Sequence, residues 1–340
     1  MTFNGRHKTM KASSNTTSIL LTSTSNIAPY IQYCDKHRLD WRTVAVACGL
    51  PIELTQSNQW LPTQDVIRFI HGLERKFGYS IGIEVGRKAS LEQLSPELDR
   101  KIEQCTSLEQ AVRCLITEIS TLSNHVTIWT EKSDGLWWLC HRSCYHPSTS
   151  GFEQAEWFRA LTVISLCRKF IDSRWQPSHA KLVSKHNSAR KLPKHFFDSD
   201  IQFEEQYGAF SIPLPDDYRA ISERNSTQDW HHAVEILIDT YATLPWFNIE
   251  WFATMLGMTK RTLQRNLKSK NILFKEAKEQ VREAKAKQLL EETNLSVQDI
   301  SWQVGYSDLS NFNRAFKGWV GQTAPDYRRQ NQSSATKNPT

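Results

Sequence analysis

The sequence lacks the features that mark a membrane-embedded protein or an enzyme. No run approaches the ~20 consecutive apolar residues that a membrane-spanning helix needs. A glycine-rich phosphate loop, a G-x-S-x-G elbow, an H-E-x-x-H pair and a regularly spaced Cys/His quartet are all missing. We therefore expect a protein that neither spans a membrane nor catalyses a reaction, and we expect no bound cofactor or metal.

Cysteine is missing from the whole second half of the chain. The seven cysteines lie between Cys34 and Cys167, and in a cytosolic protein they are most simply reduced, buried thiols. Cys140 and Cys144 stand in the one cluster that suggests a metal or redox site, but their C-x3-C spacing is not that of a zinc knuckle. Alternation along a strand would also send neighbouring ligands to opposite faces. A thiol- or metal-responsive regulator using Cys140 and Cys144 is kept as an alternative.

Length and composition predict two or three globular domains. The 340 residues are 39% hydrophobic and 11% aromatic, which allows each domain to bury its own core. Residues 1–18 are polar, and the Ile-Leu-Leu at 19–21 is too short for a signal-peptide core. We expect a disordered N-terminus, a cytoplasmic protein and a disordered tail at 330–340.

Residues 19–223 predict an α+β domain, because helical and strand patterns both occur there. Helical patterns cover 27–51, 63–77, a stretch from 106 and 152–171, and strand patterns cover 125–130, 136–140, 180–184 and 202–203. Asp134-Gly135 predicts a hairpin turn, because these residues suit the left-handed backbone conformation. Residues 224–245 form the expected linker, with a short apolar helix at 232–241.

Residues 246–329 contain two similar units, each a short apolar helix, a glycine turn and a polar helix. In the first, Asn248 is the expected N-cap, Gly257 ends the support helix and Thr259 caps the next helix. Helical spacing points Leu263 and Leu267 inward. The outer faces then carry Lys260, Arg261, Thr262, Gln264, Arg265 and Lys268.

The second unit repeats this plan. Ser296 and Asp299 have capping-box-like spacing, Gly305 supplies the turn, and Ser307 is the expected cap of the polar helix. Asn and Arg suit adenine and guanine edges, because each can form two parallel hydrogen bonds in the major groove. The side chains expected outside are Ser310, Asn311, Asn313 and Arg314.

Residues 273–292 contain neither glycine nor proline and predict one continuous helix between the units. Apolar residues recur there at near-helical spacing, namely Phe274, Ala277, Val281, Ala284 and Leu289. At ~1.5 Å per residue the helix spans roughly 30 Å. That length suits two reading helices in successive major grooves, which lie roughly 34 Å apart. The sequence therefore predicts an all-α domain with two helix-turn-helix motifs joined by a linker helix, binding double-stranded DNA.

The same residues resemble the C-terminal domain of AraC/XylS-type transcription regulators. The resemblance rests on the segments at 256–265, 281–290, 300–308 and 312–328. It implies that Arg261, Gln264 and Arg265 face DNA from the first polar helix, and Ser310, Asn311, Asn313 and Arg314 from the second. It also implies promoter or operator DNA and RNA polymerase as partners.

Three residues depart from that family's pattern. Asn271 stands where a glycine is usual, and asparagine tolerates the left-handed conformation well enough to keep the turn. Ser301 replaces a usual alanine and adds a hydroxyl that can bond back to its own helix. Pro325 falls one residue later than usual, which affects the expected final turn but not the expected fold.

Positive charge is concentrated in the region of the two units. Residues 246–329 contain 14 basic and 9 acidic side chains, so most of the formal charge of +6 lies there. Residues 260–287 hold 10 basic and 3 acidic side chains, whereas residues 288–329 hold more acidic than basic ones. Our hypothesis is that the first unit supplies most of the phosphate affinity and the second adds discrimination.

The front domain is similar to the arabinose-binding-like N-terminal domain of a regulator subgroup that includes ornithine- and virulence-type regulators. The matching segments are 81–86, 106–111, the 129–138 hairpin, Glu156 and 195–197 with Phe203. The resemblance implies that this domain binds a small effector, forms a homodimer, or both. One hypothesis for the effector site is an apolar cavity lined by Trp129, Trp137, Trp138, Trp157 and Phe158, with Arg142 or Arg159 anchoring an acidic group. Ordinary core packing is the competing interpretation.

These patterns predict a sequence-specific transcription regulator, an activator by resemblance, controlled by an effector or by dimerisation. An architectural DNA-bending protein without an effector is a second alternative. A repair enzyme that carries the same reader beside an alkyl-accepting cysteine is disfavoured, because no four-cysteine knuckle is present.

Overall fold

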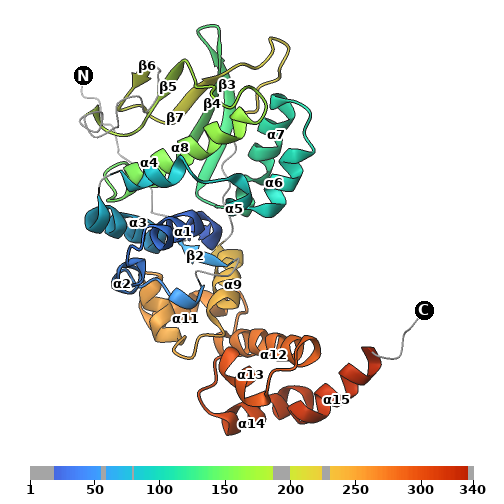
Figure 1. Cartoon of the computed structure of the whole chain (residues 1–340). Helices are drawn as coiled ribbons and strands as arrows, with labels where there is room; N and C mark the ends of the chain where they lie inside the picture. Colours follow the sequence, from blue (N-terminus) through green and yellow to red (C-terminus); the bar gives the residue numbers. More distant parts are fainter. Residues whose placement is uncertain (1–18, 55–58, 79, 187–199, 224–229, 336–340) are drawn as a thin grey trace, which may run out of the picture.

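The molecule is elongated, with a β-sheet at one end and the last helices at the other (Figure 1). The computed structural model describes residues 19–54, 59–78, 80–186, 200–223 and 230–335. The expected disordered N-terminus, the resemblance at 195–197 and the linker residues 224–229 lie outside these ranges. None of the helices within them is long and apolar enough to cross a membrane.

The front domain is α+β, as predicted, and its main sheet has five strands in the order β3-β4-β7-β5-β6. Their bounds are Val126–Ser133 (β3), Leu136–Ser143 (β4), His179–Lys181 (β5), Asp200–Gln202 (β6) and Gly208–Ile212 (β7). The β3–β4 hairpin turns at Asp134 and Gly135, whose φ values of 53° and 76° confirm the predicted left-handed turn. The sequence did not reveal β7, although it is the central strand.

Helices cover this sheet and continue away from it. They are α1 (Ala28–Lys36), α2 (Trp41–Ala47), α3 (Thr63–Phe77), α4 (Ile81–Gly86), α5 (Leu91–Leu94), α6 (Pro96–Glu103), α7 (Leu108–Glu118) and α8 (Phe152–Arg168). A small antiparallel sheet of β1 (Leu21–Ser23) and β2 (Trp60–Pro62) leads into α3. Short strands of this kind carry too few residues for a periodic signal.

Helix α8 is held tightly on both sides. A Cβ added at Gly82 of α4 would lie 2.2 Å from the backbone oxygen of Gln154 in α8, so only glycine allows this approach. On the other side, the buried carboxylate of Glu156 accepts hydrogen bonds from the backbone N–H groups of Val183 (2.7 Å) and Ser184 (3.0 Å). Burial raises the pKa of Glu156, and the hydrogen bonds together with the nearby charge of Arg159 act in the opposite direction. These contacts fix the face of α8 that is turned toward the cavity described below.

The described part of the expected linker, residues 230–245, belongs to a core. Helix α9 (Trp230–Tyr241) buries Trp230, Val234, Leu237 and Tyr241, which are each at most 4% exposed. They belong to one apolar cluster that also contains helices α1 to α3 and the first helix-turn-helix unit. From residue 230 on, the chain between the two domains is therefore packed, and the first helix-turn-helix unit shares its core with the front domain.

The C-terminal region is all-α, as predicted. Its helices are α10 (Ile249–Met255), α11 (Lys260–Ser269), α12 (Phe274–Glu292), α13 (Val297–Gln303), α14 (Leu309–Val320) and α15 (Ala324–Ala335). Helix α12 is the predicted continuous spacer, but Ala284 is exposed and Ala286 is the buried alanine, because the helix turns a different face to its neighbours. Helix α15 extends to Ala335, so residues 330–335, which we expected in a disordered tail, are helical.

Candidate nucleic-acid interface and effector cavity

Local capping interactions build the first helix-turn-helix unit. The side chain of Asn248 accepts from the backbone N–H of Trp251 at 2.8 Å, and that of Thr259 accepts from Thr262 at 3.2 Å. Both predicted caps are thereby confirmed. Leu263 and Leu267 are almost fully buried, which turns the polar faces of α11 outward.

The second unit differs from prediction at one cap. Ser296 caps α13 by accepting from the backbone N–H of Asp299 at 3.0 Å. Helix α14 is capped by Asp308, which accepts from the backbone N–H of Asn311 at 2.8 Å, and not by Ser307 as we expected. The helix begins one residue later because the Asp308 carboxylate reaches the third N–H of the helix and also favours its positive end.

The ten predicted DNA-binding residues lie on α11 and α14, and nine of them are exposed. Thr262 is half-buried with its hydroxyl 2.9 Å from that of Thr259, and Lys260 forms an ion pair with Glu250. The other eight side chains have no hydrogen bond or ion pair within the described part of the chain, so their donors and acceptors are available to a ligand. They are Arg261, Gln264, Arg265, Lys268, Ser310, Asn311, Asn313 and Arg314.

Arg282 of the spacer helix joins the segment just before the first unit to the second unit. Its Nε donates to the backbone oxygen of Ala242 (2.7 Å) and its Nη2 to that of Leu244 (3.2 Å). Its guanidinium carbon also lies 4.9 Å from the centre of the Tyr306 ring in the second unit. The second unit has an apolar cluster of its own, built on residues such as Ile300, Phe312 and Phe316. Its position relative to the first unit therefore depends on α12 and this arginine.

The three departures from the family pattern are accommodated locally. Asn271 adopts the expected left-handed conformation with φ of 58°. The hydroxyl of Ser301 donates to the backbone oxygen of Gln298 at 2.7 Å, in its own helix. Pro325 is the second residue of α15, where the helix needs no N–H donor.

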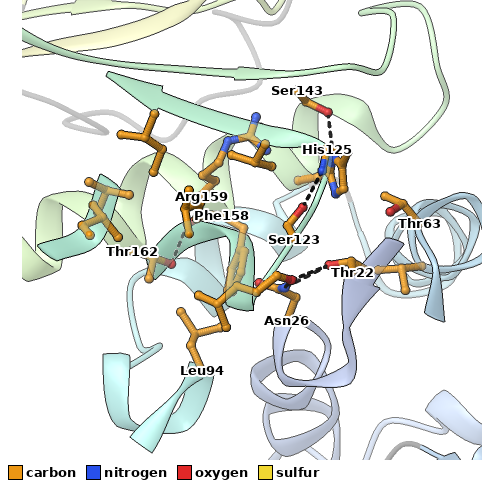
Figure 2. A pocket seen from close by; sticks show the side chains of 18 of the residues that line it. Thr22, Asn26, Thr63, Leu94, Ser123, His125, Ser143, Phe158, Arg159 and Thr162 are labelled. Carbon is orange, nitrogen blue, oxygen red and sulfur yellow. Dashed lines mark hydrogen bonds between the residues drawn. The ribbon is translucent and has the colours of Figure 1, made fainter. Parts of the chain in front are cut away.

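The front domain encloses an apolar cavity of about 110 Å³ between α3, α8 and β3 (Figure 2). Its walls include Val66 and Ile70 of α3, Leu94 of α5, Val126 of β3 and Phe158 of α8. Segments far apart in the sequence contribute to it, so no single stretch carries a signal for it. Arg159 of α8 is the main charged group in its wall.

Of the residues that we grouped as an effector site, only Phe158 and Arg159 line this cavity. Trp137 and Trp157 belong to the core between the sheet and the helices, and the indole N–H of Trp137 donates to the backbone oxygen of Pro215 at 3.0 Å. Trp129 and Trp138 pack in another cluster with Cys140. Arg142 pairs with Glu223 at 3.2 Å and lies over the Trp129 ring. Alternation along β3 and β4 separates these aromatic residues between the two sheet faces.

The cysteine pair has the properties of unreactive thiols. Cys140 is fully buried, whereas Cys144 is exposed beyond the end of the same strand, and both are free. Burial raises the pKa of the Cys140 thiol, which keeps it protonated and weakly nucleophilic at neutral pH, and partial desolvation by neighbouring groups also raises the pKa of Cys144. No metal-binding group of His, Cys, Asp and Glu occurs among the described residues.

Comparisons with known families match both halves of the chain. The helix-turn-helix domain model matches residues 252–330. The model for the arabinose-binding domain of AraC transcription regulators, N-terminal, matches residues 39–215, which is more than half of the chain.

Curated relatives match the DNA-reading region. The ornithine utilization regulator of Pseudomonas aeruginosa is 36% identical over 81 residues, 24% of each protein. The HTH-type transcriptional regulator VirS of Mycobacterium tuberculosis is 35% identical over 79 residues, 23% of each protein. The chain thus spans about a quarter of the length of these relatives. The crystal structure of the transcriptional regulator CdpR from Pseudomonas aeruginosa aligns over 90% of this chain and 98% of its own, with 18% identity and a TM-score of 0.42.

Proposed function

Since this chain belongs to the AraC family of DNA-binding transcription regulators, we propose that its two reading helices bind successive major grooves of a promoter and that a small effector controls this binding. The observation that carries the proposal is the set of eight unpaired polar side chains on α11 and α14. A spacer helix of 19 residues, roughly 28 Å long, separates them. Activation through contact with RNA polymerase and action as a homodimer are further parts of the proposal, drawn from the family.

The direct test is to map the sites that the full chain occupies on genomic DNA and to measure its preference for them over random duplex. We expect an affinity ratio of roughly 10³ or more, as specific DNA-binding proteins show. A ratio near one, with no response to any small molecule, would favour the architectural alternative. Light scattering of the free and DNA-bound chain tests the homodimer, and transcription from a reconstituted promoter tests activation.

The uneven charge of the two units predicts different roles for Arg265 and Arg314. Replacing Arg265 with methionine is expected to reduce the slope of log affinity against log salt concentration by roughly 0.9, the value for one lost phosphate contact. The matched Arg314→Met variant is expected to leave the slope nearly unchanged and to weaken base discrimination by about 1–3 kcal/mol. Binding titrations at several salt concentrations measure both effects. Equal changes of slope in the two variants would contradict the division of roles.

The apolar core offers a route by which the effector controls the first reading helix. Val66 and Ile70 line the cavity on α3 and belong to the same apolar cluster as Phe252 and Leu263 of the first unit. An occupant that favours one packing of α3 would shift the population of conformations in which α11 can reach the groove. The second unit has a separate apolar cluster, so the change in packing would reach it only through α12.

A further inference from the structure

Arg159 is a half-buried cation whose guanidinium has unpaired donors. Its Nε donates to Nδ1 of His141 at 3.2 Å, and its Nη1 and Nη2 atoms have no hydrogen-bond or ion-pair partner among the residues that the structure describes. Arginine keeps its proton in proteins, so a positive charge with two unpaired Nη donors lines the cavity. An arginine beside an apolar cavity normally has its donors paired, because partial removal of its charge from water is costly.

The neighbouring titratable groups leave the Nη donors of Arg159 without a hydrogen bond, although Glu156 attracts its charge electrostatically. His141 accepts the hydrogen bond from Arg159 and is therefore uncharged, and burial together with Arg159 lowers its pKa well below the ordinary value. The same two causes lower the pKa of His125 to about 3. The Glu156 carboxyl already accepts hydrogen bonds from the backbone N–H groups of Val183 and Ser184, and burial raises its pKa. Burial also raises the pKa of the Tyr30 hydroxyl, which stays protonated.

The rest of the cavity suits hydrocarbon. Several of its polar side chains are already engaged: Asn26 donates to Thr22 and Leu122, and Thr162 donates to Phe158. A sugar would leave many hydroxyl groups without partners there, and a phosphate would place two negative charges against one cation. The volume of about 110 Å³ is smaller than the ~150 Å³ cavity that accepts benzene in another protein, so it limits the apolar part of a ligand to a small ring or a short branched chain.

We propose that this cavity binds a small monocarboxylate with an apolar ring or short branched chain, and that its carboxylate pairs with the two free Nη atoms of Arg159. The guanidinium presents these donors in the fork that a carboxylate accepts in bidentate fashion. Arg159, Ser143 and Phe152 also border a neighbouring, more polar hollow, so the charged end of the ligand lies on the polar side. The inference rests on the proposed effector control and names the chemical class of the effector.

The test compares acids with neutral molecules of the same shape. Benzoate and cyclohexanecarboxylate are titrated into the full chain while its melting temperature is followed, alongside benzamide and cyclohexanecarboxamide. We expect at least one acid to raise the melting temperature in a saturable way, and its amide to bind roughly 30-fold more weakly or worse, the factor for losing a charge-assisted bidentate contact of about 2 kcal/mol. Equal binding of acid and amide, or no binding of either acid at about 10 mM, would overturn the inference.

Variants identify the anchor. Arg159→Met is expected to weaken acid binding by roughly the same 30-fold, whereas Arg113→Met, which removes an exposed arginine that donates to the backbone oxygen of Arg219 and lines neither hollow, keeps wild-type affinity. Acid binding should also be constant between pH 6 and 8, because His125 and His141 stay neutral there; a histidinium anchor would lose affinity over that range. Full acid binding by Arg159→Met would contradict the assignment even if the acid binds the wild type.

The same samples separate this inference from the proposed function. Promoter preference is measured for the wild type and for Arg159→Met with and without the acid. Intact preference for the promoter without any acid binding would reject the ligand class and leave DNA recognition standing. Loss of promoter preference in the wild type would reject the proposed function itself, whatever the acid does.

Discussion

Gly305→Ala is expected to lower the free energy of unfolding by about 3 kcal/mol and to abolish promoter preference. Gly305 has φ of 85°, where an L side chain costs about 1–2 kcal/mol. A Cβ there would also lie 2.4 Å from the backbone oxygen of Thr243 and 2.7 Å from Nη2 of Arg282, and relieving such overlap typically costs about 1–3 kcal/mol. The overlap falls at the junction that positions the second unit, so DNA binding should suffer with stability.

Gly257→Ala is the matched control for this substitution. Gly257 occupies the corresponding turn of the first unit with φ of 66°, but no atom lies within 4 Å of an added Cβ. Only the backbone strain of about 1–2 kcal/mol remains, so promoter preference should persist. Urea unfolding and electrophoretic mobility shifts measure the two effects. Similar losses in both variants would show that the contact with Thr243 is not what makes Gly305 necessary.

Arg282→Met should cost about 3 kcal/mol of stability and weaken promoter binding roughly 100-fold. The substitution keeps much of the aliphatic packing but removes the donors to the oxygens of Ala242 and Leu244, and such buried acceptors cost about 1–3 kcal/mol each when unpaired. The contact with the Tyr306 ring is lost as well. The two reading helices then no longer keep one fixed spacing, so a site that needs both is bound more weakly.

The control for Arg282 is Lys275→Met on the same helix. Lys275 is 87% exposed and forms only a long ion pair of 3.9 Å with Glu279, so its loss should change stability by less than about 0.5 kcal/mol. The diagnostic measurement is affinity for the full promoter site against a half-site read by α11 alone. If Arg282→Met weakened both equally, the arginine would support the fold in general and not the spacing of the two units.

Much of the DNA-reading region could be predicted because its signals are local. Asn248, Thr259 and Ser296 lie next to the helices that they cap, and Asn271 provides its own turn conformation. The hairpin at Asp134 follows from the same kind of local rule. The cap of α14 was misplaced by one residue, since a serine and an aspartate compete there within a single turn and only their geometry separates them.

The front domain was predicted less completely because its organisation depends on distant contacts. Strand β7 pairs with β4 and β5, which lie on both sides of it in space but far from it in the sequence. The hairpin is rich in tryptophan, as ligand sites often are. Its tryptophans lie on different sheet faces, however, and other residues line the cavity. No sequence pattern marked Leu94, Val126 or Ile70 as neighbours of Arg159.

The sequence by itself determined the two helix-turn-helix units, the spacer helix, the polar side chains of the reading helices and the α+β class of the front domain, because turns, caps and helical periodicity act over a few residues. Only the tertiary structure decided that the first unit shares its core with the front domain while the second has its own, and that Arg159 lines an apolar cavity with two unpaired Nη donors. These features depend on which faces of distant segments meet, and that is settled by packing over the whole chain.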